Sequence, residues 1–160
     1  MQTISAVPLT REAFAPFGSV IETDGANSFP INNGNTERFH ALAEAQTGEG
    51  KAIISIFRGQ PFTSPVPVNL MERHPLGSQA FFPLQDRPWL VVVAPDEEGV
   101  PGDLQAFLAS GRQGVQYAAN VWHRPLVSLD VVGDFLVVDR DGPGDNLEEC
   151  VLDEELLVIV

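Results

Sequence analysis

The sequence predicts a mainly β protein, and three observations indicate this class. Short apolar runs, many of them alternating with polar residues, recur from residue 52 to the end of the chain. Pro, Gly, Asp and Asn separate these runs. Helical patterning is sparse and confined to short segments near the N-terminus. Many short strands with frequent turn signals and little helix are typical of a β-sandwich or a β-barrel.

The expected elements follow in order from the N-terminus. Residues 10–15 suit one helical turn capped by a threonine. Residues 19–22 are predicted to form a short strand, and Asn-Asn-Gly-Asn at 32–35 is a turn signal. Residues 36–46 could form a helix or an irregular crossing. Further strands are predicted at 52–58, 66–74, 79–84, 89–94, 104–108, 126–132, 135–139 and 156–160.

Length and composition limit the possible organisation. A chain of 160 residues predicts one domain, spanning 1–160, with a sizeable core. No apolar run is long enough to span a bilayer. The first residues lack the basic and apolar regions of a signal peptide, and the single cysteine, Cys150, permits no internal disulfide. We therefore expect a cytoplasmic protein.

The charge of the chain excludes two classes of partner. Its 9 basic and 22 acidic residues give a net charge of −13, which argues against nucleic acid and against anionic membranes. Residues 139–155 carry eight of the acids and are expected to form a solvated surface. Eight of the nine bases are arginine, the better residue for holding a carboxylate by two contacts.

The segment 71–83 concentrates polar side chains between two apolar runs, and a Pro-Leu-Gly turn divides it. If the preceding run is a strand, Val68, Leu70, Glu72 and His74 share one face, because side chains alternate along a strand. A charge on a buried face must be paired, solvated or bound to a ligand. The segment therefore predicts the mouth of a pocket.

The chain contains three histidines, and two of them are candidates for one site. His123 follows His74 by 49 residues, so strands that fold back as a roll can bring the two together. With Glu72 and Gln79 they offer two nitrogens, a carboxylate and an amide oxygen, which suits a borderline divalent metal. The alternative is that Glu72 and His74 form an ion pair at a rim and that His123 packs in the core.

These residues resemble the two motifs of the cupin superfamily. Glu72-x-His74-x4-Gln79 resembles the first motif, with Glu and Gln standing where that motif has His and Glu. Ala118-x-Asn120-x-x-His123 resembles the second motif, of which the final histidine is kept. The resemblance implies a jelly-roll barrel with a few short helices.

The chain more closely resembles the ureidoglycolate lyase family, along nearly its whole length. The blocks Glu-Arg-His-Pro-Leu-Gly at 72–77 and Asn-Val-Trp-His at 120–123 are the most specific. Ala118 and Ala119 depart from the larger, basic residues expected there, which affects the expected substrate affinity. Further matching blocks are 31–34, 37–40, 55–61, 78–81, 114–117, 134–136 and 139–140.

This second resemblance implies a homodimeric, cytoplasmic enzyme of allantoin and purine degradation, acting in nitrogen utilisation. It would cleave (S)-ureidoglycolate, a small ureido acid, to glyoxylate and urea. A divalent metal is implied, with Ni²⁺ the ion associated with the family. Two alternatives stay open: a non-catalytic protein that binds or senses a small carboxylate, and an amidohydrolase that releases ammonia from a ureido acid.

The reaction requires loss of a hydroxyl proton and protonation of the leaving nitrogen, and Glu72, His74 and His123 are the candidate catalytic groups. Arg58, Arg73 and Arg38 are candidates for binding the substrate carboxylate. Strand alternation turns Arg73 away from Glu72, which favours Arg58 unless Arg73 serves across a dimer interface.

Other polar residues have structural as well as functional interpretations. Asn32 is expected in a turn and could also contact substrate, and the hydroxyl of Tyr117 could do the same. Asp134 and Asp139 flank a predicted strand. We expect them to form strand-end hydrogen bonds or a pair with Arg140.

Overall fold

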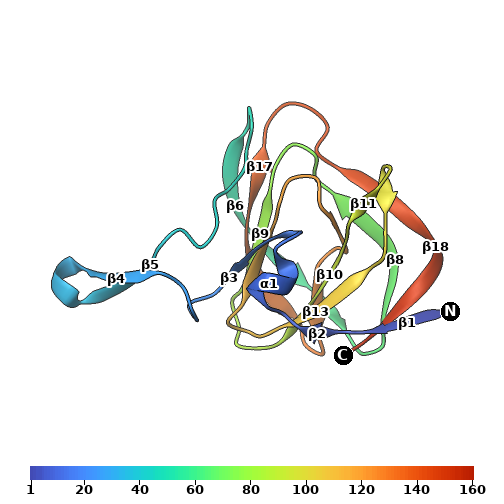
Figure 1. The fold of residues 1–160 in the computed structure, drawn as a ribbon, viewed down its shortest axis with the longest axis horizontal. Coiled ribbons are helices and arrows are strands. Elements are labelled where there is room, and N and C mark those ends of the chain that lie inside the picture. The colour runs from blue at the N-terminus through green and yellow to red at the C-terminus, as the bar shows by residue number, and fades with distance from the viewer.

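The computed structural model describes residues 1–160, and most of its strands belong to two β-sheets (Figure 1). The first sheet has the order β1-β18-β8-β15-β10-β13-β2, with β16 paired to β10 and β7 paired to β16. Its strands are β1 (Gln2–Ser5), β2 (Val7–Pro8), β7 (Pro61–Phe62), β8 (Val66–Arg73), β10 (Trp89–Ala94), β13 (Gln105–Ala109), β15 (Trp122–His123), β16 (Val127–Leu129) and β18 (Glu148–Ile159).

The second sheet has the order β3-β14-β9-β17-β6. Its strands are β3 (Gly18–Ile21), β14 (Gly114–Tyr117), β9 (Gln79–Pro83), β17 (Gly133–Asp141) and β6 (Lys51–Gly59). Two hairpins stand apart from both sheets. They pair β4 (Ser28–Ile31) with β5 (Thr36–Phe39), and β11 (Asp96–Glu97) with β12 (Val100–Pro101).

The mainly β class is confirmed. The closed jelly-roll barrel stays a prediction, because the hydrogen bonds resolve into two sheets. The helices are α1 (Arg11–Phe14), in which the Thr10 hydroxyl accepts a hydrogen bond from the Ala13 amide as predicted, and the 3-10 turn η1 (Asn32–Gly34). Residues 36–46 form β5 followed by irregular chain. Neither helix has the length and apolar character to cross a bilayer.

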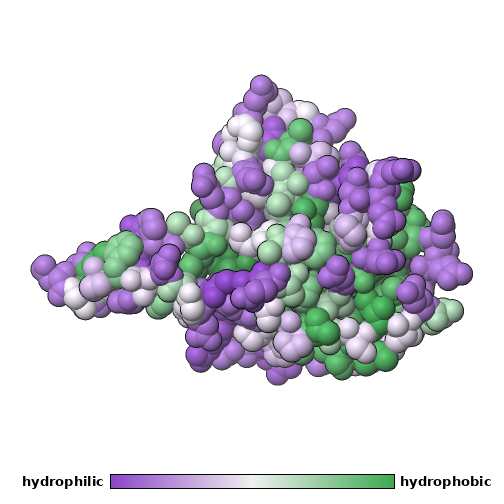
Figure 2. All heavy atoms as spheres, viewed as in Figure 1, coloured by the Kyte–Doolittle hydropathy of each residue, from purple (hydrophilic) through white to green (hydrophobic).

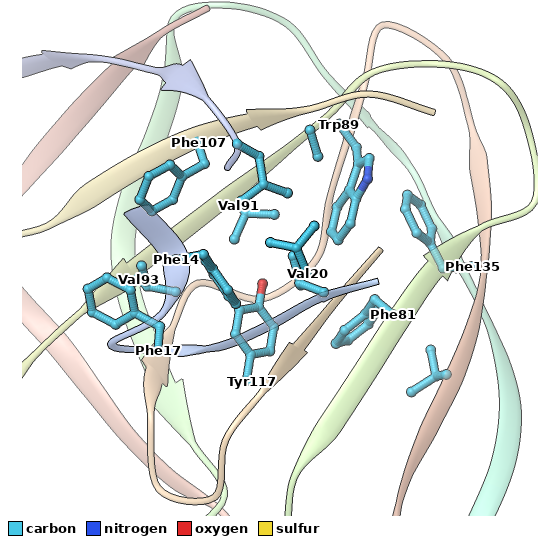
Figure 3. Close-up of a cluster of buried hydrophobic side chains, with 14 residues drawn as sticks. Phe14, Phe17, Val20, Phe81, Trp89, Val91, Val93, Phe107, Tyr117 and Phe135 are labelled. Atoms are coloured by element: carbon cyan, nitrogen blue, oxygen red, sulfur yellow. The ribbon is translucent and has the colours of Figure 1, made fainter. Parts of the chain in front are cut away.

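A cluster of 14 buried residues joins the two sheets and α1 (Figure 3). The rings of Trp89 and Phe135, from opposite sheets, have centroids 5.1 Å apart. Phe14 brings α1 into the same cluster, with its ring 6.0 Å from that of Phe107. Aromatic side chains of this size bury about 150–250 Å² each. This shared core therefore holds the two sheets together.

Strand β10 is buried on both faces, which explains its unbroken apolar run. Val91 and Val93 belong to the core between the sheets. Leu90, Val92 and Ala94 belong to a second cluster of 12 residues, which includes side chains of β8 and β18. A strand buried on both faces has a continuous apolar sequence, unlike a strand with one solvated face.

Three connections cross between the two sheets and meet at one end of the molecule. They join β8 to β9, β14 to β15 and β17 to β18. The Asn120 amide donates to the His74 carbonyl over 2.8 Å, and the Leu76 amide donates to the side chain of Asn146 over 2.8 Å. The predicted polar site lies where these connections touch.

Replacing Val91 with alanine should lower the free energy of unfolding by about 2 kcal/mol, since two buried methyl groups are lost and a cavity is left. Val91 is fully buried between the sheets. The same substitution at Val151, which is 75% exposed on β18, should cost less than about 0.5 kcal/mol. Urea denaturation followed by circular dichroism measures both values. Equal losses would contradict the assignment of the core.

Candidate metal centre

The structure brings Glu72, His74 and His123 together, as the sequence predicted. Glu72 of β8 lies directly opposite His123 of β15 in the strand register. His74 is the first residue after β8, at the start of the connection to β9. One ligand atom from each of the three side chains lies within 4.8 Å of the others. Two short stretches of chain 49 residues apart thus supply the centre.

The face expected to run from Val68 to His74 is interrupted. Val68 and Met71 are three residues apart, yet both lie in the second apolar cluster, so the alternation changes phase between them. Strand β18, which pairs with β8, has an irregular register between Val151 and Leu156 at the same level. The prediction that Val68 shares the face of Glu72 is therefore wrong, because a long-range pairing irregularity shifts the alternation.

Both imidazoles are held by backbone carbonyl groups. Nδ1 of His74 lies 2.8 Å from the Asn146 carbonyl, and Nδ1 of His123 lies 3.0 Å from the Val121 carbonyl. A carbonyl only accepts hydrogen bonds, so Nδ1 carries the proton in each ring and Nε2 presents a lone pair. Both Nε2 atoms are buried without a hydrogen-bond partner.

The Glu72 carboxylate faces these two lone pairs. Its Oε1 lies 3.4 Å from Nε2 of His123 and 3.9 Å from Nε2 of His74. Burial raises the pKa of Glu72, but the closeness of His123 and the positive charges that both imidazoles carry when protonated outweigh it and leave the pKa below its usual value. Glu72 is therefore ionised at neutral pH. The Glu72 and His74 side chains are about a fifth exposed, which leaves the centre open to solvent on one side.

Tyr117 forms the wall behind His123. The two rings stack with centroids 4.1 Å apart and planes inclined by 8°. Figure 3 shows the tyrosine hydroxyl directed toward Val20 and Val91, inside the core between the sheets. Burial raises the pKa of Tyr117. The ring face of Tyr117, rather than its hydroxyl, thus contacts the centre.

Arg73 points away from the centre, as strand alternation predicted. Its guanidinium pairs with Asp96 over 2.8 Å and with Glu148 over 2.7 Å. It also lies over the ring of Trp122, with 4.3 Å between its central carbon and the ring centroid. Trp122 Nε1 donates to the same Asp96. Arg73 therefore anchors the reverse face of the strands that carry Glu72 and His123.

Three other predicted substrate-binding residues lie outside the cluster. Arg58 forms a two-contact pair with Asp134, at 2.8 and 3.1 Å, and its side chain is 70% exposed. Asn32 lies in η1, and Arg38 lies in β5, which places both on the hairpin that projects from the body (Figure 1). Their contacts with substrate stay predictions.

Gln79 and Asp139 are joined by a hydrogen bond from Gln79 Nε2 to Asp139 Oδ2 over 3.1 Å. Gln79 stands opposite Tyr117 in the register of β9 and β14. The expected pair of Asp139 with Arg140 is not formed, because neighbours on a strand point to opposite faces. Arg140 instead donates to the carbonyl groups of Thr47 and Pro143.

The donor set fits a divalent metal. Two imidazole nitrogens and one carboxylate converge, and the nitrogens have no hydrogen-bond partner. This mixture suits nickel, manganese, iron or zinc. Hydrogen bonds from the opposite ring nitrogens to carbonyl groups are the usual support for ligating histidines.

Sequence reasoning missed three residues that shape this centre. Asn146 holds His74 through its carbonyl group and Leu76 through its side chain, and the Asn120 amide bonds the His74 carbonyl. Such contacts between crossing connections leave no local pattern. Asn120 adopts a left-handed conformation with φ of 69°. Asp139 had a detectable signal, because it continues the alternation of the buried Phe135 and Val137 on β17.

Comparison with known proteins agrees with the sequence resemblance. A family described as ureidoglycolate lyase matches residues 1–159. "Ureidoglycolate lyase 1" of Rhizobium meliloti is 62% identical over 157 residues, covering 97% of this chain and 92% of that protein. The ureidoglycolate lyase of Brucella anthropi is 58% identical over 93% of this chain and 89% of that protein. The ureidoglycolate lyase of Burkholderia mallei is 56% identical over 98% of this chain and 93% of that protein.

Replacing His123 with alanine should abolish binding of a divalent ion, because one of two convergent nitrogens is lost. Elemental analysis after dialysis against Ni²⁺, with calorimetric titration of the same ion, measures the loss. The control is His40→Ala, since His40 lies beside Phe29 on the projecting hairpin, with 5.6 Å between the ring centroids. Equal ion binding by the two variants would contradict the assigned centre.

Proposed function

We propose that this chain, which belongs to the ureidoglycolate lyase family, cleaves (S)-ureidoglycolate to glyoxylate and urea. We also propose that Glu72, His74 and His123 form its active centre. The observation that carries the assignment of the centre is the convergence of two unpartnered imidazole nitrogens on an ionised carboxylate. We also assign the enzyme to purine and allantoin degradation, a role supported by the proposed substrate, and to the cytoplasm.

The reaction moves one proton and breaks one bond. The reacting carbon of ureidoglycolate carries a carboxylate, a hydroxyl and a ureido nitrogen. The hydroxyl loses its proton, its oxygen becomes the aldehyde oxygen of glyoxylate, and the carbon–nitrogen bond breaks with its electron pair going to nitrogen. That nitrogen takes up a proton and leaves as urea. One group that accepts a proton and then returns it is therefore sufficient.

We assign this proton transfer to Glu72. The lowered pKa keeps its carboxylate ionised at neutral pH, so that it can accept the hydroxyl proton. Once protonated beside two imidazoles, it is acidic enough to return the proton to the leaving nitrogen. The Nδ1–carbonyl bonds orient both rings so that each Nε2 faces Glu72. His74 and His123 then act by orienting substrate and by holding an ion.

Glu72, His74 and His123 would hold a divalent ion, for which we favour Ni²⁺, with Gln79 as the proposed fourth ligand. When bound, such an ion supplies positive charge that lowers the pKa of the substrate hydroxyl and attracts the substrate carboxylate. The amide oxygen of Gln79 is buried and has no hydrogen-bond partner, which supports its inclusion.

We further propose that the enzyme is a homodimer. Strand β6 is the nine-residue edge of the second sheet, and its outer face exposes Ile54 (72%) and Ile56 (62%). Leu136, opposite Ile56 on β17, is 38% exposed and continues this face. A long apolar edge that stays uncovered promotes association with other chains. A second copy placed by two-fold symmetry would cover it.

The projecting β4–β5 hairpin gives a second reason for a dimer. It pairs with no other strand, and a two-stranded hairpin alone is marginally stable in water. Phe29 and Phe39 on it are 43% and 38% exposed, and Figure 2 shows hydrophobic side chains along it. If this hairpin packs against a second copy, Asn32 and Arg38 would contact substrate in the site of that copy.

Ile56→Glu should convert the dimer to a monomer, because the interface would bury an unpaired charge. Sedimentation velocity at several protein concentrations measures the change. The control is Val151→Glu, which adds the same charge at an exposed valine of the first sheet and should leave the dimer intact. A wild-type protein that stays monomeric, or a dimeric Ile56→Glu, would contradict the proposal.

Product analysis tests the reaction. Purified protein with (S)-ureidoglycolate should release urea and glyoxylate in equal amounts without ammonia. Ammonia in place of urea would instead select the amidohydrolase, and saturable binding without turnover would select the carboxylate sensor. Glu72→Gln should lower kcat/KM by at least about 100-fold, the lower end of a general acid–base contribution.

The control for Glu72→Gln is Glu149→Gln. Glu149 stands opposite Glu72 in the register of β8 and β18 but is exposed. The Glu149→Gln protein should retain wild-type turnover. Metal content measured in parallel distinguishes a lost ligand from a lost proton acceptor. Near-native turnover by a folded Glu72→Gln protein would eliminate the proposed role of the carboxylate.

A further inference from the structure

Four buried side-chain polar atoms in the chain have no hydrogen-bond partner. Two are the imidazole Nε2 atoms of the centre, and the others are Oε1 of Gln79 and Oδ1 of Asp139. A buried polar group without a partner is destabilising, and more so when it is charged. Neither the proton transfer nor the proposed ion site uses Oδ1 of Asp139, so this oxygen calls for an explanation.

Asp139 lies on the inner face of the second sheet. Phe135 and Val137, at the preceding alternate positions of β17, are fully buried in the core between the sheets. Val138 of β17 stands opposite Ala80 of β9, so Asp139 and Gln79 are the next pair along the two strands. Their hydrogen bond joins these neighbours across the strands.

A continuous series of contacts leads from Asp139 to the centre. Asp139 bonds Gln79, Gln79 stands opposite Tyr117, and the ring of Tyr117 stacks on His123. Gln79 begins β9, Tyr117 ends β14, and Asp139 lies two residues before the end of β17. All three strand ends meet the crossing connections that bring His74 and His123 together.

The hydrogen bonding defines what Asp139 can recognise. Its Oδ2 accepts from Gln79 Nε2, which turns the amide so that Oε1 is the free atom of Gln79. Its Oδ1 can only accept a hydrogen bond. Neighbouring Arg140 is committed to the carbonyl groups of Thr47 and Pro143, so it does not supply the donor. A ligand that satisfies Oδ1 must therefore bring an N–H or O–H group.

We propose that Asp139 determines specificity for the ureido group: its Oδ1 accepts a hydrogen bond from a ureido N–H of the substrate, while its Oδ2 orients Gln79. The inference rests on the proposed function and extends it to substrate recognition. A divalent ion held by Glu72, His74 and His123 would attract the substrate carboxylate to the histidine end, which leaves the ureido group toward Asp139. This orientation places the carbon–nitrogen bond between the two ends.

Binding of two inert ligands tests the proposal in the metal-loaded protein. N-carbamoylglycine carries the ureido group but lacks the reacting hydroxyl, whereas glycolate has the carboxylate and hydroxyl without the ureido group. Asp139→Asn should weaken binding of N-carbamoylglycine by about 10–100-fold, the effect of losing a hydrogen bond to a charged acceptor. Binding of glycolate should change less than about twofold. Isothermal titration calorimetry measures both.

Asp141→Asn is the matched control, because Asp141 is exposed two residues further along β17, and it should leave both affinities unchanged. Asp139→Ser is the second variant and should show the same selective loss if Asp139→Asn fails to fold. Equal weakening of the two ligands, or no weakening of N-carbamoylglycine, would overturn the inference. Turnover of ureidoglycolate by the wild-type protein tests the proposed function separately.

Discussion

The half-buried carboxylate of Glu72 is the constraint on which the rest of the site depends. A charge removed from water must be paired, solvated or bound to a ligand, and the Nε2 atoms of two imidazoles lie within 4 Å of this one. Each imidazole is useful only if its Nε2 faces the carboxylate. The carbonyl groups of Asn146 and Val121 impose that orientation. The crossing connections that supply these carbonyls must therefore meet at one end of the two sheets.

Side chains on the opposite face of β8 and β15 hold the register of these strands. Glu72 and His123 face the centre, while the next residue on β8, Arg73, and the preceding residue on β15, Trp122, stack on each other behind it. Asp96 bonds both of these outer side chains. A slip by one residue would exchange the two faces of a strand and would put Arg73 in the place of Glu72. The anchoring on the reverse face thus preserves the chemistry.

The parts of the site that follow local patterns were predictable from the sequence. Alternation predicted that Arg73 turns away from Glu72, and the resemblance to a known family, rather than spacing alone, predicted that His123 joins His74. Long-range pairings left no such signal. The pairing of Arg58 with Asp134 joins residues 76 positions apart. The phase change before Met71 coincides with the irregular pairing of β8 and β18. The β-rich class follows from periodicity, whereas side-chain partners across strands depend on the assembled sheets.

The charges around the centre bear on the proposed cation. The carbonyl partners orient both imidazoles, and the Glu72 carboxylate is ionised between them. The guanidinium nearest in sequence, that of Arg73, is bonded to other acids on the reverse face. An anionic substrate would therefore meet net negative charge in a protein of net charge −13. A divalent ion held by the two imidazoles and the carboxylate would reverse that sign, so in the proposed enzyme it would favour binding of the substrate carboxylate.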